Sequence, residues 1–282
     1  MNDLSGIRLI ATDLDGTLLR HGQPIAPATV AAVRAALDAG IAVLPVTGRP
    51  LHWLDILRTD LPELDRVIAA NGTVVYDLHQ EQVLWKSTIA PALTGAFARL
   101  LDERVPDAVL AFETLAGSVV EPSFKGRTPR NASVVTRAEV VSGDTTPESL
   151  ADVIKILVRI PGNTDSAKLQ DAIAPLTRLD SGALHGTYSD PNNGLLELSP
   201  AGVTKAHTLE LYTRSLQLTP EQVVAFGDMP NDIEMLRWAG TSFAMTGGHP
   251  DALAAATGAC PELDAGGVAE PIRRILSAQA TR

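Results

Sequence analysis

The stretch IRLIATDLDGTLL, residues 7–19, places two carboxylates directly after an apolar run. The run is typical of a buried strand that ends before Asp13, and Asp15 follows two residues later. In an extended chain, residues i and i+2 point to the same side, about 7 Å apart along the strand. Two carboxylates at the end of a buried strand repel each other, and neither is easily removed from water. The stretch therefore predicts a site that also contains positive charge.

The sequence on either side of this stretch predicts a parallel sheet covered by helices. Apolar residues recur at helical spacing in PATVAAVRAALDAG, residues 27–40, and a second apolar run, IAVLPV, follows at residues 41–46. RVIAANGTVVYD, residues 66–77, predicts a hairpin with an Asn-Gly turn. Continuous apolar strands that alternate with helices are typical of a parallel sheet with both faces covered. We therefore expect an α/β fold with a Rossmann-like, doubly wound parallel sheet.

The middle of the chain has a different pattern. Residues 83–191 mix helices with short strands and prolines, and include the basic loop SFKGRTPRNAS, residues 123–133. From about residue 194 the first pattern returns, starting with a strand at LLELS, residues 195–199. We predict a core domain over 1–82 and 192–282, and an inserted α/β (α+β) cap domain over 83–191.

Composition excludes several classes of protein. The formal net charge of −10 argues against a general binder of nucleic-acid backbones, which needs a clustered basic surface. The single cysteine, Cys260, allows neither an intrachain disulfide nor a cysteine-type zinc site. The first residues lack a signal-peptide pattern, and no apolar stretch approaches the roughly 20 residues that span a bilayer. We expect a cytoplasmic protein without a nucleic-acid or membrane partner.

Polar side chains follow three of the predicted strands. Asp13 follows IRLIAT, Thr47 follows IAVLPV, and Asp228 follows VVAFG. In open α/β sheets, ligands bind outside the carboxyl ends of the strands, so we expect these residues to form one site. Asp228 adds a third carboxylate, and Asp232 is a candidate fourth. Such oxygen-rich clusters suit a hard divalent cation, which predicts Mg²⁺.

Four motifs, in this order, resemble those of the haloacid dehalogenase superfamily. They are DLDGTLL (13–19), VTGR (46–49), the lysine of SPAGVTKAHTLELY (199–212) and GDMPND (227–232). Within that superfamily the chain is similar to the Cof-type sugar-phosphate phosphatases, in which an α/β cap is inserted between the second and third motifs. The resemblance implies a Mg²⁺-dependent hydrolase acting on a small phosphorylated metabolite. It covers residues 1–82 and 192–282, whereas in the cap it rests on position and length.

The resemblance also implies a role for each motif residue. Asp13 would be the nucleophile that becomes an aspartyl-phosphate, and Asp15 the acid and then the base. Thr47 and Gly48 would bind the phosphoryl oxygens, and Lys205 would neutralise charge on the phosphate and the nucleophile. These roles agree with the chemistry, because a carboxylate can attack an anionic phosphate only if their repulsion is screened.

The metal site would draw on several of the same residues. Asp13, the backbone carbonyl of Asp15, and Asp228 would hold the Mg²⁺, and Asn231 and Asp232 would complete the metal and phosphate surroundings. In the cap, Lys125, Arg127 and Arg130 are candidate substrate contacts, although a solvated charged loop is the favoured interpretation of all three.

Two other functions remain open at this point. A phosphomutase on a related scaffold would return the phosphoryl group to a sugar rather than to water. A phosphate- or metal-sensing module would keep the pocket without turnover, but a pure binder does not need an acid/base two residues from a nucleophile. The sequence contains no G-x-x-x-x-G-K-[ST], G-x-G-x-x-G or G-x-S-x-G motif. Both a monomer and a homodimer are compatible with it.

Overall fold

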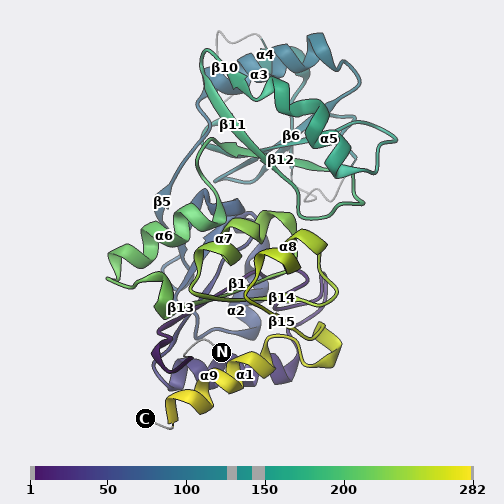
Figure 1. Cartoon of the computed structure of the whole chain (residues 1–282). Coiled ribbons are helices and arrows are strands. Elements are labelled where there is room, and N and C mark those ends of the chain that lie inside the picture. Colours follow the sequence, from purple (N-terminus) through teal and green to yellow (C-terminus); the bar gives the residue numbers. More distant parts are fainter. Residues whose placement is uncertain (1–3, 126–131, 142–149, 281–282) are drawn as a thin grey trace. The chain divides into compact units, whose positions relative to one another are not determined.

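A computed structural model describes residues 4–125, 132–141 and 150–280 of the chain. Contacts group the chain into two compact units (Figure 1). The core unit comprises Met1–Arg49, Trp53–Trp85 and Thr204–Arg282, and the inserted unit comprises Pro50–His52 and Lys86–Val203.

The core unit is built on a five-stranded sheet with the order β15-β14-β13-β1-β2, and all neighbouring strands are parallel. Helices lie on both faces of this sheet (Figure 1). α1 and α9 pack together on one face, and α6, α7 and α8 form the layer on the other. The expected doubly wound parallel sheet is therefore confirmed. The elements are β1 (Leu9–Thr12), α1 (Pro27–Asp38), β2 (Ala42–Pro45), α2 (Asp55–Asp60), α6 (Lys205–Ser215), β13 (Val223–Gly227), α7 (Ile233–Trp238), β14 (Thr241–Met245), α8 (Pro250–Ala255), β15 (Gly258–Cys260) and α9 (Ala269–Ala280).

The central strands are almost entirely apolar because both of their faces are covered. Every residue of β1 and of β13 is buried. α1 begins at Pro27, whose fixed φ suits the first turn of a helix, and it buries Thr29, Ala32, Val33 and Ala36. This spacing of three and four residues forms one apolar stripe against the sheet.

The predicted hairpin is present. β3 (Arg66–Ala69) and β4 (Val74–Asp77) pair antiparallel and, with β5 (Gln82–Lys86), make a three-stranded sheet. A parallel bridge between Val46 and Ile68 links this sheet to the chain that leaves β2. The link places the hairpin turn, η3 (Ala70–Gly72), beside the segment that follows β2.

The inserted unit contains a seven-stranded sheet with the order β10-β11-β12-β9-β6-β7-β8. One face of this sheet carries an apolar core that includes Phe97, Phe112 and Ile156. The elements are α3 (Pro91–Arg104), β6 (Val109–Thr114), β7 (Ser118–Val120), β8 (Ser133–Val134), α4 (Arg137–Val141), β9 (Val153–Arg159), α5 (Ser166–Ile173), β10 (Arg178–Leu179), β11 (Gly182–Thr187) and β12 (Leu196–Pro200).

One strand assignment from the sequence is wrong. LLELS was expected to start the second part of the core, but β12 pairs antiparallel with β9 and β11 in the inserted unit. Leu196 and Leu198 belong to the apolar core of that unit, whereas Glu197 lies between them. This alternation is typical of an antiparallel sheet with one apolar face. We therefore propose that the inserted domain extends to about residue 203, rather than to 191.

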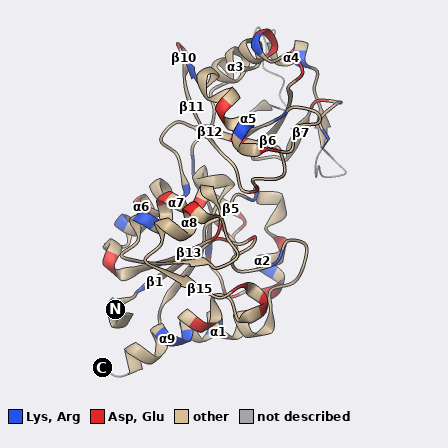
Figure 2. Cartoon of the chain, turned by 45° about the vertical axis from the view of Figure 1, so that its right-hand side comes forward, with Lys and Arg blue, Asp and Glu red and all other residues tan. Residues whose placement is uncertain are grey.

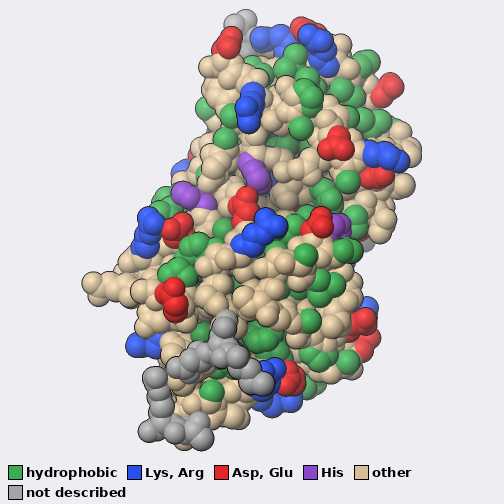
Figure 3. Space-filling view, in the orientation of Figure 1, with side chains coloured by type: hydrophobic (Ala, Val, Ile, Leu, Met, Phe, Trp, Pro, Cys, Tyr) green, Lys and Arg blue, Asp and Glu red, His purple; other side chains and the backbone are tan. Residues whose placement is uncertain are grey.

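Charged residues of both signs are interspersed along the elements of each unit (Figure 2). Basic and acidic side chains also mix on the face drawn in Figure 3. Among the helices of the described ranges, none combines the length and apolar character that crossing a membrane requires.

Candidate active site

The carboxyl ends of three adjacent strands bring the predicted residues together. β1 lies between β13 and β2 in the sheet. Asp13 directly follows β1, Asp228 directly follows β13, and Thr47 lies two residues beyond β2. The amide of Asp13 donates a hydrogen bond of 2.9 Å to the carbonyl of Phe226, so the strand pairing extends to the nucleophile candidate.

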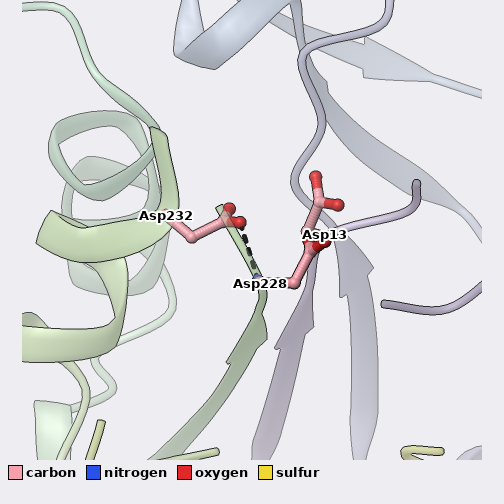
Figure 4. Close-up of side chains that lie close together, drawn as sticks. All are labelled: Asp13, Asp228 and Asp232. Carbon is pink, nitrogen blue, oxygen red and sulfur yellow. Dashed lines mark hydrogen bonds between the residues drawn. The ribbon is translucent and has the colours of Figure 1, made fainter. Parts of the chain in front are cut away.

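Three buried carboxylates form a cluster at this edge of the sheet. Asp13, Asp228 and Asp232 each offer one oxygen, and these oxygens all lie within 4.8 Å of one another. Figure 4 shows Asp13 and Asp228 at the ends of β1 and β13, and Asp232 in the turn before α7. That turn is the short helix η7 (Pro230–Asp232). The exposed fraction is 6% for Asp13, 4% for Asp228 and 0% for Asp232, so water screens their repulsion poorly.

Lys205 supplies positive charge to the cluster. Its Nζ donates to Asp13 Oδ1 at 2.5 Å and to Asp232 Oδ1 at 2.6 Å, and the residue is only 1% exposed. Burial alone lowers the pKa of a lysine, but the two carboxylates outweigh burial and raise the pKa of Lys205. Lys205 is the first residue of α6, whose N-cap Thr204 accepts a hydrogen bond from the amide of His207.

One lysine does not balance three carboxylates. Burial raises the pKa of Asp13 well above its ordinary value; Lys205 opposes this shift, and Asp232 and Asp228 add to it. Burial and the Asp232 carboxylate likewise raise the pKa of Asp228 to about 7. Both shifts come first from burial and then from repulsion between the carboxylates, which Lys205 does not outweigh. These residues therefore fit a hard divalent cation, which would relieve that repulsion.

Asp232 already makes hydrogen bonds with both of its carboxylate oxygens. Oδ1 accepts from Lys205, and Oδ2 accepts from the amides of Asp228 and Met229 at 3.1 Å each. Asp232 thus fixes the loop that carries Asp228 (Figure 4). Asp228 Oδ1 in turn accepts from the hydroxyl of Thr17 at 3.0 Å. Asp13 and Asp228 are consequently the better candidates for direct cation ligands.

The glycine of the DLDGT motif is required by a close approach. Gly16 has a φ of +90°, a region that favours glycine. A Cβ at this position would lie 2.1 Å from Asp228 Oδ2. The loop after β1 can therefore reach Asp228 only with glycine at position 16.

Asp15 is held by two residues that the sequence did not connect with it. Arg49 Nε and Nη2 donate to the two Asp15 oxygens at 2.6 and 2.7 Å, and His21 Nδ1 lies 2.8 Å from Oδ1. Burial raises the pKa of Asp15, but the hydrogen bonds and charge of Arg49, followed by those of His21, outweigh it and lower the pKa. Arg49 belongs to the VTGR motif, where the sequence suggested a role in docking cap to core rather than a contact with Asp15, whereas His21 is part of no motif.

Three of the predicted phosphate-binding residues, Thr47, Gly48 and Asn231, lie beside the hairpin residue Asn71. Thr47 Oγ1 accepts from the amide of Arg49 at 3.1 Å, which shapes the turn through Gly48. A Cβ on Gly48 would lie 2.9 Å from Asn71 Oδ1, the oxygen that accepts from Asn231 Nδ2 at 3.2 Å. All eight predicted site residues thus lie in the core unit. Asn71 was predicted only as part of the hairpin turn.

The candidate substrate contacts of the cap remain predictions. Lys125 is exposed in the inserted unit. Arg127 and Arg130 lie outside the described residues.

Comparison with known proteins identifies the family. Residues 10–272 match the family model of haloacid dehalogenase-like hydrolases. The chain belongs to this family. The resemblance of the four motifs is therefore confirmed at the level of the family.

Relatives in the family are named phosphatases. The chain is 29% identical over 258 residues to pyridoxal phosphate phosphatase YbhA of Escherichia coli, covering 88% of this chain and 90% of that protein. It is 29% identical over 239 residues to 5-amino-6-(5-phospho-D-ribitylamino)uracil phosphatase YcsE of Bacillus subtilis, covering 85% and 84%. The structure of BT1666 from Bacteroides thetaiotaomicron aligns with a TM-score of 0.76 at 23% identity, covering 95% of each chain, and supports the fold.

Proposed function

We propose that the protein is a Mg²⁺-dependent phosphatase that hydrolyses a small phosphorylated metabolite, such as a sugar phosphate. The observation that carries the proposal is the buried contact of Lys205 with Asp13 and Asp232 beside Asp228. A carboxylate can attack an anionic phosphate only where positive charge already compensates their repulsion. The names of the relatives support the same reaction class.

In the first step, an oxygen of Asp13 attacks phosphorus. The bond from phosphorus to the leaving oxygen breaks, and an aspartyl-phosphate forms on Asp13. Lys205 and the hydroxyl of Thr47 stabilise charge on the phosphoryl oxygens. Asp13, Asp228 and the backbone carbonyl of Asp15 would hold a Mg²⁺ ion, which would supply further neutralising charge.

In the second step, water attacks the phosphorus of the aspartyl-phosphate, and the bond from phosphorus to the Asp13 oxygen breaks. Asp15 acts in both steps: once protonated, it gives that proton to the leaving alcohol, and it then takes one from the attacking water, which releases phosphate and restores Asp13. Because Arg49 and His21 lower the pKa of Asp15, this carboxylate must take up the proton when the substrate binds. Arg49 and His21 orient the Asp15 carboxylate for both transfers. The paired hydrogen bonds of Arg49 fix the plane of the carboxylate as well as its position.

Replacing Arg49 by lysine tests the role of Asp15. Lysine keeps the positive charge but cannot form the two parallel hydrogen bonds of a guanidinium. In Arg49→Lys we expect kcat/KM on an alkyl phosphate to fall about 10–100-fold, which is less than the roughly 10²–10⁴-fold of a complete loss of general acid–base catalysis because Asp15 itself remains. On para-nitrophenyl phosphate, whose leaving group needs no proton, the fall should be much smaller. Arg34→Lys, which alters a surface ion pair with Glu63, is the matched control. Equal losses on both substrates would contradict an acid/base role for Asp15.

Mg²⁺ binding is expected to weaken below neutral pH. The pKa of Asp228 is raised to about 7 without the metal, so at lower pH the cation competes with a proton. The raised pKa also means that this group favours folding at acidic pH and that its contribution is lost as the pH rises to about 7. Mg²⁺ should therefore raise the melting temperature more at pH 8 than at pH 6, and the Kd should increase about tenfold per pH unit below 7. Calorimetric titration of Mg²⁺ at both pH values measures this; a pH-independent Kd would contradict Asp228 as a ligand.

The direct test of the proposed function is phosphate release from a panel of compounds, with Mg²⁺ and with EDTA. The panel includes hexose and pentose phosphates, nucleotides and pyridoxal phosphate. Metal-dependent release from at least one compound is the expected result. Isomerisation of a hexose phosphate without phosphate release would favour a phosphomutase instead.

The location of the enzyme in the cell and its oligomeric state are also matters for proposal and test. A single buried cysteine is compatible with a reducing compartment, so we propose a cytoplasmic location. Light scattering on the purified chain distinguishes a monomer from a homodimer.

A further inference from the structure

The turn between β3 and β4 has an unusual backbone. Ala70, Asn71 and Gly72 have φ values of 51°, 58° and 101°. Glycine and asparagine accept this left-handed region, but an alanine with a positive φ is uncommon. An Asn-Gly hairpin needs a positive φ at only two residues. Since Ala70 shares the conformation, contacts outside the hairpin must hold the turn in place.

The first set of contacts joins the turn to the phosphate-binding segment after β2. The amide of Ala70 donates to the carbonyl of Arg49 at 2.9 Å, and the amide of Asn71 donates to the carbonyl of Thr47 at 2.9 Å. The left-handed backbone turns both amides toward this one segment. The position of Thr47 therefore depends on the turn.

The second set joins the turn to the start of α6. The hydroxyl of Thr208 donates to the carbonyl of Gly72 at 2.6 Å. A Cβ on Gly72 would lie 2.3 Å from the carbonyl oxygen of Thr204, the residue before Lys205. The turn thus packs directly against the helix end that carries the catalytic lysine candidate.

The third contact comes from the side chain of Asn71. Its Oδ1 accepts from Asn231 Nδ2 at 3.2 Å, and Asn71 is only 3% exposed. Asn231 belongs to the turn that also carries Asp232. One short turn therefore contacts the segments of Thr47, Lys205 and Asn231, which come from three separate parts of the sequence.

We propose that Asn71 is a positioning residue that fixes the positions of the phosphate-binding groups relative to one another. The backbone of its turn holds Thr47 and packs against the residue before Lys205, and its amide side chain holds Asn231. Asn71 itself neither donates nor accepts the transferred proton or phosphoryl group. The inference rests on the proposed function, since it names a residue that organises the same site.

Asn71→Gly isolates the side chain, because glycine accepts the left-handed backbone without strain. We expect the melting temperature to stay within a few degrees of wild type. kcat/KM for para-nitrophenyl phosphate should fall at least about tenfold, and the Kd for inorganic phosphate in the presence of Mg²⁺ should rise. Gln217→Gly is the matched control, because Gln217 also has a positive φ (57°) but is exposed beyond the far end of α6. Its kinetics should equal those of wild type.

A double-mutant cycle separates positioning from a general structural effect. If Asn71 acts through Asn231, the effects of Asn71→Gly and Asn231→Ala on kcat/KM should not add, and the double variant should be little worse than either single variant. Additive losses, or an Asn71→Gly enzyme within twofold of wild type, would overturn the proposal.

Two further measurements keep the inference separable from the proposed function. Should Asn71→Gly not fold, Thr208→Val removes the hydrogen bond from α6 to the carbonyl of Gly72 at nearly constant volume, and the same tenfold loss is expected from it. If no compound is hydrolysed by the wild type, the proposed function fails, but calorimetric binding of inorganic phosphate still tests Asn71. Unchanged phosphate affinity in Asn71→Gly then overturns the inference alone.

Discussion

The substitution Asp13→Asn is expected to abolish phosphate release, with kcat falling by at least about 10⁴-fold, as is usual when a nucleophile is removed. Asparagine has the shape of aspartate but cannot form the acyl-phosphate bond at a useful rate. Asp13 Oδ1 is 2.5 Å from Lys205 Nζ, so the substituted amide retains a place beside the lysine. The loss should therefore reflect chemistry rather than a displaced side chain.

The same substitution should leave the fold as stable as before, or more stable. The pKa of Asp13 is raised by burial first, with Asp232 and Asp228 adding to the shift, so its charged form is disfavoured in the folded protein. A neutral amide removes that penalty. The melting temperature in the absence of Mg²⁺ should consequently equal or exceed that of wild type at pH 8.

Asp38→Asn is the matched control for this experiment. Asp38 ends α1 and is exposed, so both kinetics and melting temperature should be unchanged. Substantial phosphate release by purified Asp13→Asn would exclude Asp13 as the nucleophile. A sharply lower melting temperature would instead show that the Asp13 charge stabilises the fold, contrary to the direction of its pKa shift.

The sequence was sufficient to predict the core sheet and to place the site residues at the ends of its strands. Continuous apolar runs such as residues 7–12 and 41–46 leave few alternatives to buried parallel strands. Once the strands are parallel, Asp13, Thr47 and Asp228 must meet at one edge. This part of the site follows from local pattern and topology.

Contacts that depend on how separate loops meet could not be predicted in the same way. Arg49 and His21 reach Asp15 from different loops, and no spacing rule connects them. Asn71 was recognised as a turn residue, but its contact with Asn231 spans 160 positions of sequence. LLELS was misassigned because a short apolar run fits either sheet, and only the pairing partners decide between them.

Lys205→Met is the second substitution with a large expected effect, and it should impair both activity and stability. Methionine fills nearly the same volume but leaves Asp13 and Asp232 buried without their shared cation. Breaking a buried ion pair by removing one partner costs about 3–5 kcal/mol. The melting temperature at pH 8 without metal should therefore fall by on the order of 10 °C. Phosphate release should fall below detection, because the charge that screens nucleophile and phosphate is gone.

The stability loss should depend on pH in a definite direction. Lys205 lowers the pKa of Asp13, so its removal raises that pKa further. A carboxyl whose folded-state pKa is raised favours folding below its unfolded pKa, and this contribution is lost as the pH rises through the folded value. The difference in melting temperature between Lys205→Met and wild type should thus be smaller at pH 5 than at pH 8.

A double variant tests whether uncompensated charge causes the stability loss of Lys205→Met. Adding Asp13→Asn to Lys205→Met removes one of the two carboxylates left without a cation, so the double variant should melt at a higher temperature than Lys205→Met alone. Lys168→Met, which alters an exposed lysine of α5, controls for the loss of a surface charge and should melt like wild type. If the double variant is instead less stable than Lys205→Met, packing rather than charge accounts for the role of Lys205. The lysine would then be a structural residue of α6, and the compensation of charge on which the phosphatase proposal rests would have to come from the metal alone.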